Sequence, residues 1–390
     1  MSEVRTLGEL VARGSLALSD GYRTRADQLG PEGIPILRVA DVLDGRVDPS
    51  FKDHIRDEYR PKMGAKISRF GDVLITTKGT VGRVARVPRG FPEHSYSPQV
   101  CFLRALDIEE IDPTWLYYWA CSTELLEQIG IYKDQTDMAP YVSLTDLRRV
   151  TITLPAIKDQ RRVAAALQAL DDLIETNRVA MANLRSIALT TLDAQSRSGN
   201  VVPFGEIATQ IRDGAPSGSW APGTPYLGLE HFGTDGVGLT GVGDASTVDS
   251  TKSRFRAGDV LYGKLRPYFR KVDRPDFNGV CSTEIWVLRP KPSWGAATLN
   301  AVVARSEFTE FAMAGNTGTR MPRANWAHVV TMPVPVPPKR ERDLLDQQLD
   351  DLWRVGVALA DEIADLTRTR DVLLPLLMSG QVRVADVEAA

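Results

Sequence analysis

Residues 258–264, Gly258-Asp-Val-Leu-Tyr-Gly-Lys264, come closer to a phosphate-binding loop than any other string in the chain. They satisfy the first seven positions of the pattern GxxxxGK, in which backbone N–H groups and a lysine hold phosphates. The eighth position, where a Ser or Thr hydroxyl would bind magnesium, is Leu265, and Arg266-Pro267 follow where a helix should begin. Residues 236–241 fit GxGxxG, but no helical pattern follows them either. We interpret both strings as glycine-rich turns, and a nucleotide-binding enzyme stays an alternative.

Other residue types that carry catalysis are scattered along the chain. The four histidines do not have the spacing of metal ligands, and no GxSxG nucleophile motif is present. The sequence also lacks an Asn or Asp followed by two prolines and an aromatic residue, the loop with which adenine methyltransferases hold a flipped base. We therefore expect no catalytic residue, no metal site and no cofactor bound by this chain.

The composition is that of an ordinary globular protein. Of 390 residues, 43% are hydrophobic and 25% are charged, and the formal net charge is −3. The three cysteines lie far apart in sequence and outside any CxxC pair, which is typical of a reducing cytosol. The N-terminal residues hold no apolar run suited to a signal peptide, and no stretch reaches about 18 apolar residues. We expect a soluble cytoplasmic protein without a membrane contact.

The small net charge conceals two basic segments. Residues 60–89 hold eight cations and one acid, and residues 252–274 hold eight cations and two acids. Residues 336–390, in contrast, carry a net charge of −4. One basic cluster is often only a solvated face, but two clusters at equivalent places, the second interleaved with aromatic residues, favour a nucleic-acid surface.

The basic segments supply the candidate DNA contacts. Lysine and arginine neutralise phosphates, and arginine also makes bidentate contacts to guanine. The candidates are Lys78, Arg83 and Arg86 in the first segment, and Lys264, Arg266, Tyr268, Arg270, Lys271 and Arg320 in or near the second. Because the cluster is duplicated, a two-part DNA site is expected.

An internal repeat places these segments. Five strings recur in order, with offsets that drift from 197 to about 180. The pairs begin at Leu7 and Phe204, Pro35 and Pro225, Gly71 and Gly258, Val150 and Val330, and Ser198 and Ser379. Any single match is weak, but five in order indicate one duplication of a unit of about 190 residues.

Each copy ends in a long predicted helix. Residues 158–195 contain no Gly or Pro, and apolar residues recur at alternating steps of four and three, the seam of a coiled coil. The predicted seam is Leu167, Leu170, Ile174, Asn177, Met181 and Leu184 in the first helix, and Leu349, Leu352, Leu359, Ile363 and Leu366 in the second. Such rods would be about 60 Å long and could pair with each other, although packing of each on its own domain stays an alternative. Pro375 predicts an end or kink one turn early in the second helix.

The sequence thus predicts an α+β protein with a pseudo-twofold internal repeat. Two tandem globular domains, residues 1–155 and 200–335, are rich in short strands, with a helix expected over 113–129. Residues 156–199 form a central spacer helix, and residues 336–390 form a C-terminal helix and tail. The two helices are expected to lie side by side as a coiled coil.

Three strings give the chain a resemblance to a known family. They are Gly258-Asp-Val-Leu-Tyr-Gly-Lys-Leu-Arg-Pro-Tyr-Phe-Arg-Lys271, Gly318-Thr-Arg-Met-Pro-Arg-Ala-Asn-Trp326 and Leu154-Pro-Ala-Ile-Lys-Asp-Gln160. Over essentially its full length the chain resembles the specificity subunit of type I restriction-modification systems. The helix entries depart from the family's Pro-Pro-Leu-x-Glu-Gln, and the first basic segment resembles a different subtype of the domain from the second.

The resemblance implies a non-catalytic subunit that serves host defence and DNA methylation in a prokaryotic cytoplasm. It also implies that the two globular domains are target recognition domains and that the two long helices pair as an antiparallel coiled coil. It would read a bipartite asymmetric sequence in double-stranded DNA and dock two adenine-methyltransferase subunits, and through them restriction subunits that contain the motor. S-adenosylmethionine, ATP and magnesium are then expected on those partners. A non-catalytic coiled-coil scaffold without a nucleic-acid role stays an alternative.

Overall fold

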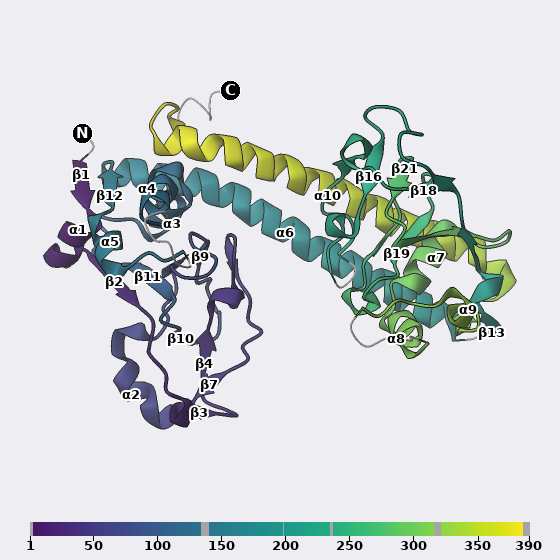
Figure 1. Cartoon of the computed structure of the whole chain (residues 1–390), viewed down its shortest axis with the longest axis horizontal. Coiled ribbons are helices and arrows are strands. Elements are labelled where there is room, and N and C mark those ends of the chain that lie inside the picture. The colour runs from purple at the N-terminus through teal and green to yellow at the C-terminus, as the bar shows by residue number, and fades with distance from the viewer. Residues whose placement is uncertain (1–2, 134–139, 198, 235–236, 316–320, 385–390) are drawn as a thin grey trace. The chain divides into compact units, whose positions relative to one another are not determined.

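The computed structural model describes residues 3–133, 140–197, 199–234, 237–315 and 321–384. They belong to two compact units, one made of residues 1–174 and 364–390 and the other of residues 175–363. Figure 1 shows that each unit combines short strands and small helices with parts of two long helices. Each unit therefore joins one of the expected recognition domains to portions of both predicted rods.

Three sheets of the first unit carry its recognition part. Their orders are β1-β12, β2-β11-β8-β9 and β10-β4-β7-β3, and β4 runs parallel to β10. The strands are β1 (Glu3–Thr6), β2 (Leu16–Asp20), β3 (Leu29–Gly30), β4 (Ile34–Leu37), β7 (His54–Ile55), β8 (Val73–Thr76), β9 (Val84–Arg86), β10 (Ser95–Tyr96), β11 (Val100–Ala105) and β12 (Thr151–Leu154). A two-stranded ribbon adds β5 (Val42–Leu43) and β6 (Arg46–Val47). The helices of this part are α1 (Leu7–Arg13), α2 (Arg60–Met63), α3 (Pro113–Cys121), α4 (Thr123–Lys133) and α5 (Leu144–Arg149).

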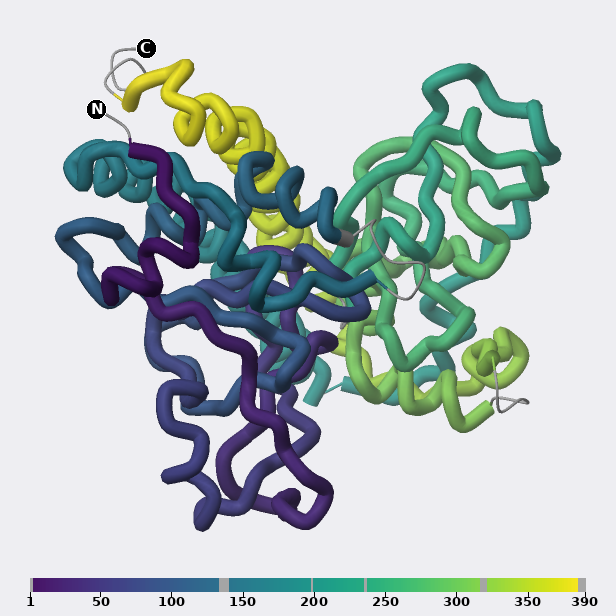
Figure 2. Tube along the Cα trace, turned by 60° about the vertical axis from the view of Figure 1, so that its left-hand side comes forward, coloured from purple at the N-terminus to yellow at the C-terminus, as the bar shows by residue number. Residues whose placement is uncertain are grey.

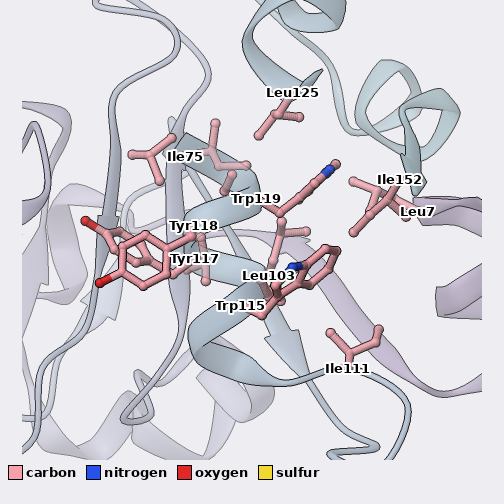
Figure 3. Packing of buried hydrophobic residues seen from close by; sticks show 14 of the residues in the cluster. Leu7, Ile75, Leu103, Ile111, Trp115, Tyr117, Tyr118, Trp119, Leu125 and Ile152 are labelled. Carbon is pink, nitrogen blue, oxygen red and sulfur yellow. The ribbon is translucent and has the colours of Figure 1, made fainter. Parts of the chain in front are cut away.

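The aromatic residues of α3 form the centre of the main core of the first unit (Figure 3). Trp115 and Trp119 are at most 1% exposed and share this core with Ile75 of β8. Leu74 points to the opposite face of the sheet and packs in a second core, as the alternation of side chains along a strand requires. Burial on both faces explains why β8 is a continuous apolar run.

The helix expected over residues 113–129 is two helices, α3 and α4, separated at Ser122. The Ser122 hydroxyl donates to the Trp119 carbonyl over 2.6 Å, and the Ser122 backbone is extended. A serine that bonds to nearby backbone offers the chain an alternative to continuing the helix. The single-helix prediction was wrong because this local competition is invisible in the apolar pattern.

The second unit repeats the arrangement of the first. Its sheet orders are β13-β23, β14-β22-β19-β20 and β15-β18-β21-β16-β17, and β16 runs parallel to β21. The strands are β13 (Asn200–Pro203), β14 (Ala208–Ile211), β15 (Gly214–Ala215), β16 (Pro225–Leu227), β17 (Gly243–Asp244), β18 (Lys252–Phe255), β19 (Val260–Gly263), β20 (Val272–Asp273), β21 (Gly279–Cys281), β22 (Ile285–Pro290) and β23 (Pro333–Val336). Its small helices are α7 (Ala296–Val303), α8 (Ser306–Ala314) and α9 (Trp326–Val329). The predicted internal repeat is confirmed in the topology.

The repeated Gly-Asp-Val-Leu string places a buried aspartate in an equivalent ion pair in both units. Gly71 and Gly258 have φ of 84° and 86°, the left-handed conformation that glycine adopts without strain. The aspartate that follows each glycine accepts the backbone N–H three residues before it and binds an arginine on the neighbouring strand. The pairs are Asp72 with Arg104 and Asp259 with Arg289. This string therefore builds the fold.

Both predicted rods are present. They are α6 (Ile157–Ser196), with 40 residues, and α10 (Arg342–Met378), with 37. In the first unit Arg370 of α10 donates to Asp171 of α6, and Leu167 shares a core with Leu377. In the second unit Gln195 of α6 donates to Gln348 of α10. Within each unit the segments of α6 and α10 therefore lie side by side and run antiparallel (Figure 1; Figure 2 gives a second view of the chain trace).

The predicted seam faces inward along both helices. Four of its residues are buried (Leu167, Ile174, Asn177 and Leu349) and seven are half-buried (Leu170, Met181, Leu184, Leu352, Leu359, Ile363 and Leu366). By comparison, Leu173 and Val355, which lie off the seam, are 47% and 50% exposed. Pro375 does not end α10, because the helix continues to Met378.

Each long helix begins with the same type of contact, although neither copy keeps the family's Pro-Pro-Leu-x-Glu-Gln motif. Gln160 donates to the Pro155 carbonyl over 2.9 Å, and the Nε of Arg342 donates to the Pro337 carbonyl over 3.3 Å. Both side chains lie five residues after the proline to which they bond. Arg342 thus occupies in the second copy the position that Gln160 occupies in the first, and this equivalence aligns the two helices within the internal repeat.

Candidate nucleic-acid interface

The first candidate contacts lie on a tight turn between β8 and β9, residues 77–83. Gly79 and Gly82 have φ of 82° and 92°, and the Thr76 hydroxyl accepts the Arg83 N–H over 3.0 Å. Lys78 is exposed at this turn. Arg83 is half-buried, and its guanidinium donates to the Val42 carbonyl at 3.4 Å.

The second group of candidates lies at the equivalent place, on the turn between β19 and β20, residues 264–271. Arg266 and Arg270, with φ of 49° and 46°, are two of the three described non-glycine residues with positive φ. They flank a short 3₁₀ turn over Pro267–Phe269, which leaves Tyr268 47% exposed. Non-glycine residues in this conformation cost about 1–2 kcal/mol each and cluster at functional sites. The conformation of turn 264–271 therefore marks it as a candidate site.

Each turn is held by a segment that approaches from just before the last small helix. Lys78 forms an antiparallel bridge with Tyr141, and Leu265 forms one with Arg323. Ala324 also donates its N–H to the Lys264 carbonyl over 2.9 Å. We call each turn, together with the segment bridged to it, the candidate surface of its unit.

Two residues of this surface were absent from the sequence prediction. Tyr141 is 46% exposed, and Arg323 is exposed and paired with Glu284 at 3.0 Å. This ion pair raises the pKa of Arg323, because hydrogen bonding to the carboxylate stabilises the charged form. Arg323 belongs to the string Gly318–Trp326, and Tyr141 lies at the equivalent place in the first copy. A comparison of these two places in the repeat could have identified both residues from the sequence.

Two predicted contacts point into their own units. The Arg86 guanidinium donates to Gln168 and Thr114, and the Nζ of Lys271 donates to the Leu229 carbonyl over 2.6 Å. These contacts favour structural roles for both side chains, and we leave them out of the DNA surface. Arg320 lies outside the described residues.

Residues 258–264 do not have the strand–loop–helix form of a phosphate-binding loop. The last four residues of the pattern before Lys264 are strand β19, and a 3₁₀ turn follows where the phosphate-binding pattern needs a helix. In the part of the chain that the structure describes, no group of three or more His, Cys, Asp or Glu side chains could hold a metal ion. Of the helices described, none is long and apolar enough to cross a membrane.

Comparison with known families identifies the fold. Residues 2–183 match the family model of the type I restriction modification DNA specificity domain. Residues 2–183 are therefore identified as a type I restriction modification DNA specificity domain, which confirms the predicted family for this part of the chain. The matched region includes turn 77–83 and most of α6.

Curated members of the specificity family align with part of the chain. The type I restriction enzyme EcoDI specificity subunit of Escherichia coli is 30% identical over 116 residues, 30% of this chain and 25% of that protein. The EcoBI specificity subunit of the same organism is 26% identical over 145 residues, 36% of this chain and 29% of that protein. The alignments thus span under a third of either relative's length.

A solved structure covers the whole chain. The S subunit of a type I restriction-modification system from M. genitalium is 17% identical, with a TM-score of 0.56 over 97% of this chain and 96% of that one. At this identity the match shows a shared fold, and the shared fold includes the second unit and α10.

Proposed function

We propose that this chain is the DNA-recognition subunit of a type I restriction-modification complex and that it reads a bipartite, asymmetric site. The duplicated turn carries the proposal: the same scaffold presents different side chains in the two units. Turn 77–83 has the sequence Thr-Lys-Gly-Thr-Val-Gly-Arg, and turn 264–271 has the sequence Lys-Leu-Arg-Pro-Tyr-Phe-Arg-Lys. Because side chains at base edges determine sequence preference, two different turns read two different half-sequences.

The proposed partners follow from the family. Two adenine-methyltransferase subunits dock on the chain, and restriction subunits with the motor join through them. S-adenosylmethionine, ATP and magnesium bind to those partners, and this chain contributes recognition and no catalytic group. The paired helices α6 and α10 act as the ruler that fixes the separation of the two half-sites.

The test is DNA binding by the full-length chain assembled with its methyltransferase subunits. A duplex selected from a randomised library gives the preferred site, and affinity is then measured against salt. Loss of a phosphate contact in Lys264→Ala should lower the slope of log K against log salt by about one and weaken binding to all sequences alike.

Lys291→Ala is the matched control. Lys291 is exposed and follows the end of β22, whereas Lys264 is half-buried and lies beside Gly263, which pairs with the start of that strand. Its replacement should leave both affinity and salt slope unchanged. An assembled wild-type complex that selects no sequence would contradict the proposed function and favour the scaffold alternative.

A further inference from the structure

The strand that leaves each turn leads to an arginine whose guanidinium reaches a long helix. In the first unit this is Arg86, the last residue of β9. Its Nη2 donates to Gln168 of α6 over 2.6 Å, and its Nη1 donates to Thr114 of α3 over 3.2 Å. The guanidinium also lies 5.0 Å from the centre of the Tyr117 ring. Arg86 therefore connects the hairpin β8–β9 to both α3 and α6.

In the second unit the corresponding residue is Arg274, which directly follows β20. Its guanidinium donates to Asp350 of α10 and lies 3.9 Å from the centre of the Trp353 ring. The Arg274 side chain is only 7% exposed. Asp273, beside it, accepts the N–H groups of Leu239 and Arg274. The returning strand of the second hairpin is thus fixed to α10.

The two contacts occupy equivalent positions in the repeat. Arg86 lies opposite Val73 across its hairpin, and the register of β19 with β20 places Arg274 opposite Val260, the counterpart of Val73. On the helices, Gln168 lies eight residues after Gln160, and Asp350 lies eight residues after Arg342. The helix-entry contacts already make Gln160 and Arg342 equivalent. We call these two contacts, Arg86 with Gln168 and Arg274 with Asp350, the arginine clamps.

We infer that Arg86 and Arg274 are positioning residues that set the orientation of each DNA-reading turn on its long helix, and so determine the half-site spacing that the protein accepts. This inference rests on the proposed function. Arg86 lies three residues after the end of turn 77–83, and Arg274 lies three residues after the end of turn 264–271. At about 3.3 Å per residue, each turn ends about 10 Å from its clamp.

The chemistry of the clamps suits positioning. A planar guanidinium that is both hydrogen-bonded and stacked on an aromatic ring has a defined direction, which a lysine at the same place lacks. The returning strands β9 and β20 are edge strands of their sheets and have only three and two residues, so few ladder hydrogen bonds fix their direction. The clamp adds a constraint between turn and helix.

The two clamps differ in a way that provides a matched control. The acceptor is neutral in the first, where Gln168 in turn donates to Asp172 over 2.6 Å, and it is a carboxylate in the second. Asp350→Gln gives the second clamp the acceptor of the first and should preserve its geometry. Arg274→Met has similar length and apolar character but removes the guanidinium.

The experiment uses the assembled complex and duplexes in which the two selected half-sequences are separated by the preferred spacer or by one base pair more or fewer. Wild type and Asp350→Gln are expected to prefer one spacer by about tenfold or more. Arg274→Met should lose most of that preference, to within about threefold, while each half-site keeps its base preference. Arg86→Met should behave likewise.

Several outcomes separate the inference from the proposed function. Wild-type spacer preference in a folded Arg274→Met complex would overturn the inference and leave the proposed function intact, and absence of any selected site in the wild type would overturn the proposed function itself. A purely structural role for Arg274 predicts a lower melting temperature with unchanged spacer preference. If Arg274→Met does not fold, Arg274→Lys keeps the charge beside Asp350 and should broaden the accepted spacers through loss of the stacked plane.

Discussion

Arg266 has a φ of 49° in the middle of the proposed DNA surface, where the backbone cost and the guanidinium can be separated by substitution. Arg266→Gly removes both the guanidinium and the steric cost of the left-handed conformation, whereas Arg266→Ala removes only the guanidinium. We expect both variants to lose discrimination at the same base pair, by about 1–3 kcal/mol. The glycine variant should be the more stable of the two, by up to about 1 kcal/mol.

Selection from a randomised library checks the base preference, and thermal unfolding checks the stability. If Arg266→Gly keeps the wild-type preference at every position, the Arg266 guanidinium does not read a base, and turn 264–271 contributes through its other side chains.

At the residue scale, His94 should make the stability of the first unit fall at acidic pH. The ring is fully buried among Phe51, Phe91 and Tyr96, its Nδ1–H donates to the Pro92 carbonyl over 2.8 Å, and Nε2 has no hydrogen-bond partner among the described residues. Burial lowers the pKa of His94, and the bond to Pro92 and the carboxylates of Asp72 and Glu93 only partly oppose the shift.

The sign of the pH effect follows from that lowered pKa. The unfolded chain takes up the proton near pH 6.5, but the folded unit resists it, so stability falls as the pH drops below about 6.5. His94→Phe keeps the aromatic packing and removes the titration. The free energy of unfolding of the wild type should therefore fall relative to that of His94→Phe between pH 8 and pH 5, and a pH-independent difference would refute this account.

At the scale of elements, the ion pair that each Gly-Asp-Val-Leu string forms predicts that the two hairpins lose different amounts of stability when its aspartate is neutralised. Asp72 is fully buried, and Arg104 is 8% exposed, whereas Arg289, the partner of Asp259, is 35% exposed. Asp72→Asn leaves an uncompensated buried charge and should cost about 3–5 kcal/mol. Asp259→Asn should cost less, because water reaches Arg289.

Hydrogen exchange of the amides in β8 and β19 measures the two losses separately, since the units need not unfold together. Equal destabilisation by the two substitutions would contradict the role assigned to solvent exposure.

The single helix predicted over 113–129 shows a limit of prediction from the sequence at the scale of elements. The apolar pattern there is continuous, but one serine hydroxyl bonds to the backbone and divides the segment into α3 and α4.

At the scale of the whole molecule, the ruler proposal predicts that helix length determines the DNA spacer. Insertion of one helical turn near Asn177 adds about 5.4 Å, which corresponds to between about one and two base pairs. The recognised spacer should lengthen, while both half-sequences stay unchanged. Library selection with the inserted variant measures both properties, and a changed half-sequence would refute the ruler.

The sequence by itself determined the duplication, the two long helices, the inward seam and the family. These features depend on local periodicity and on repeated strings, which can be recognised without knowledge of distant contacts. It also located both turns, because glycines and clustered cations mark them in the chain. Which of those cations face outward could not be predicted in the same way.

Only the tertiary structure decided the direction of each guanidinium. Arg83 and Arg86 lie three residues apart in one basic segment, yet Arg86 bonds to Gln168, 82 residues further along the chain. Lys271 likewise turns to Leu229, and Arg274, which the sequence prediction passed over, stacks on Trp353. The reason is physical: composition records a charge, but strand register and the packing of a remote helix determine which partner that charge meets.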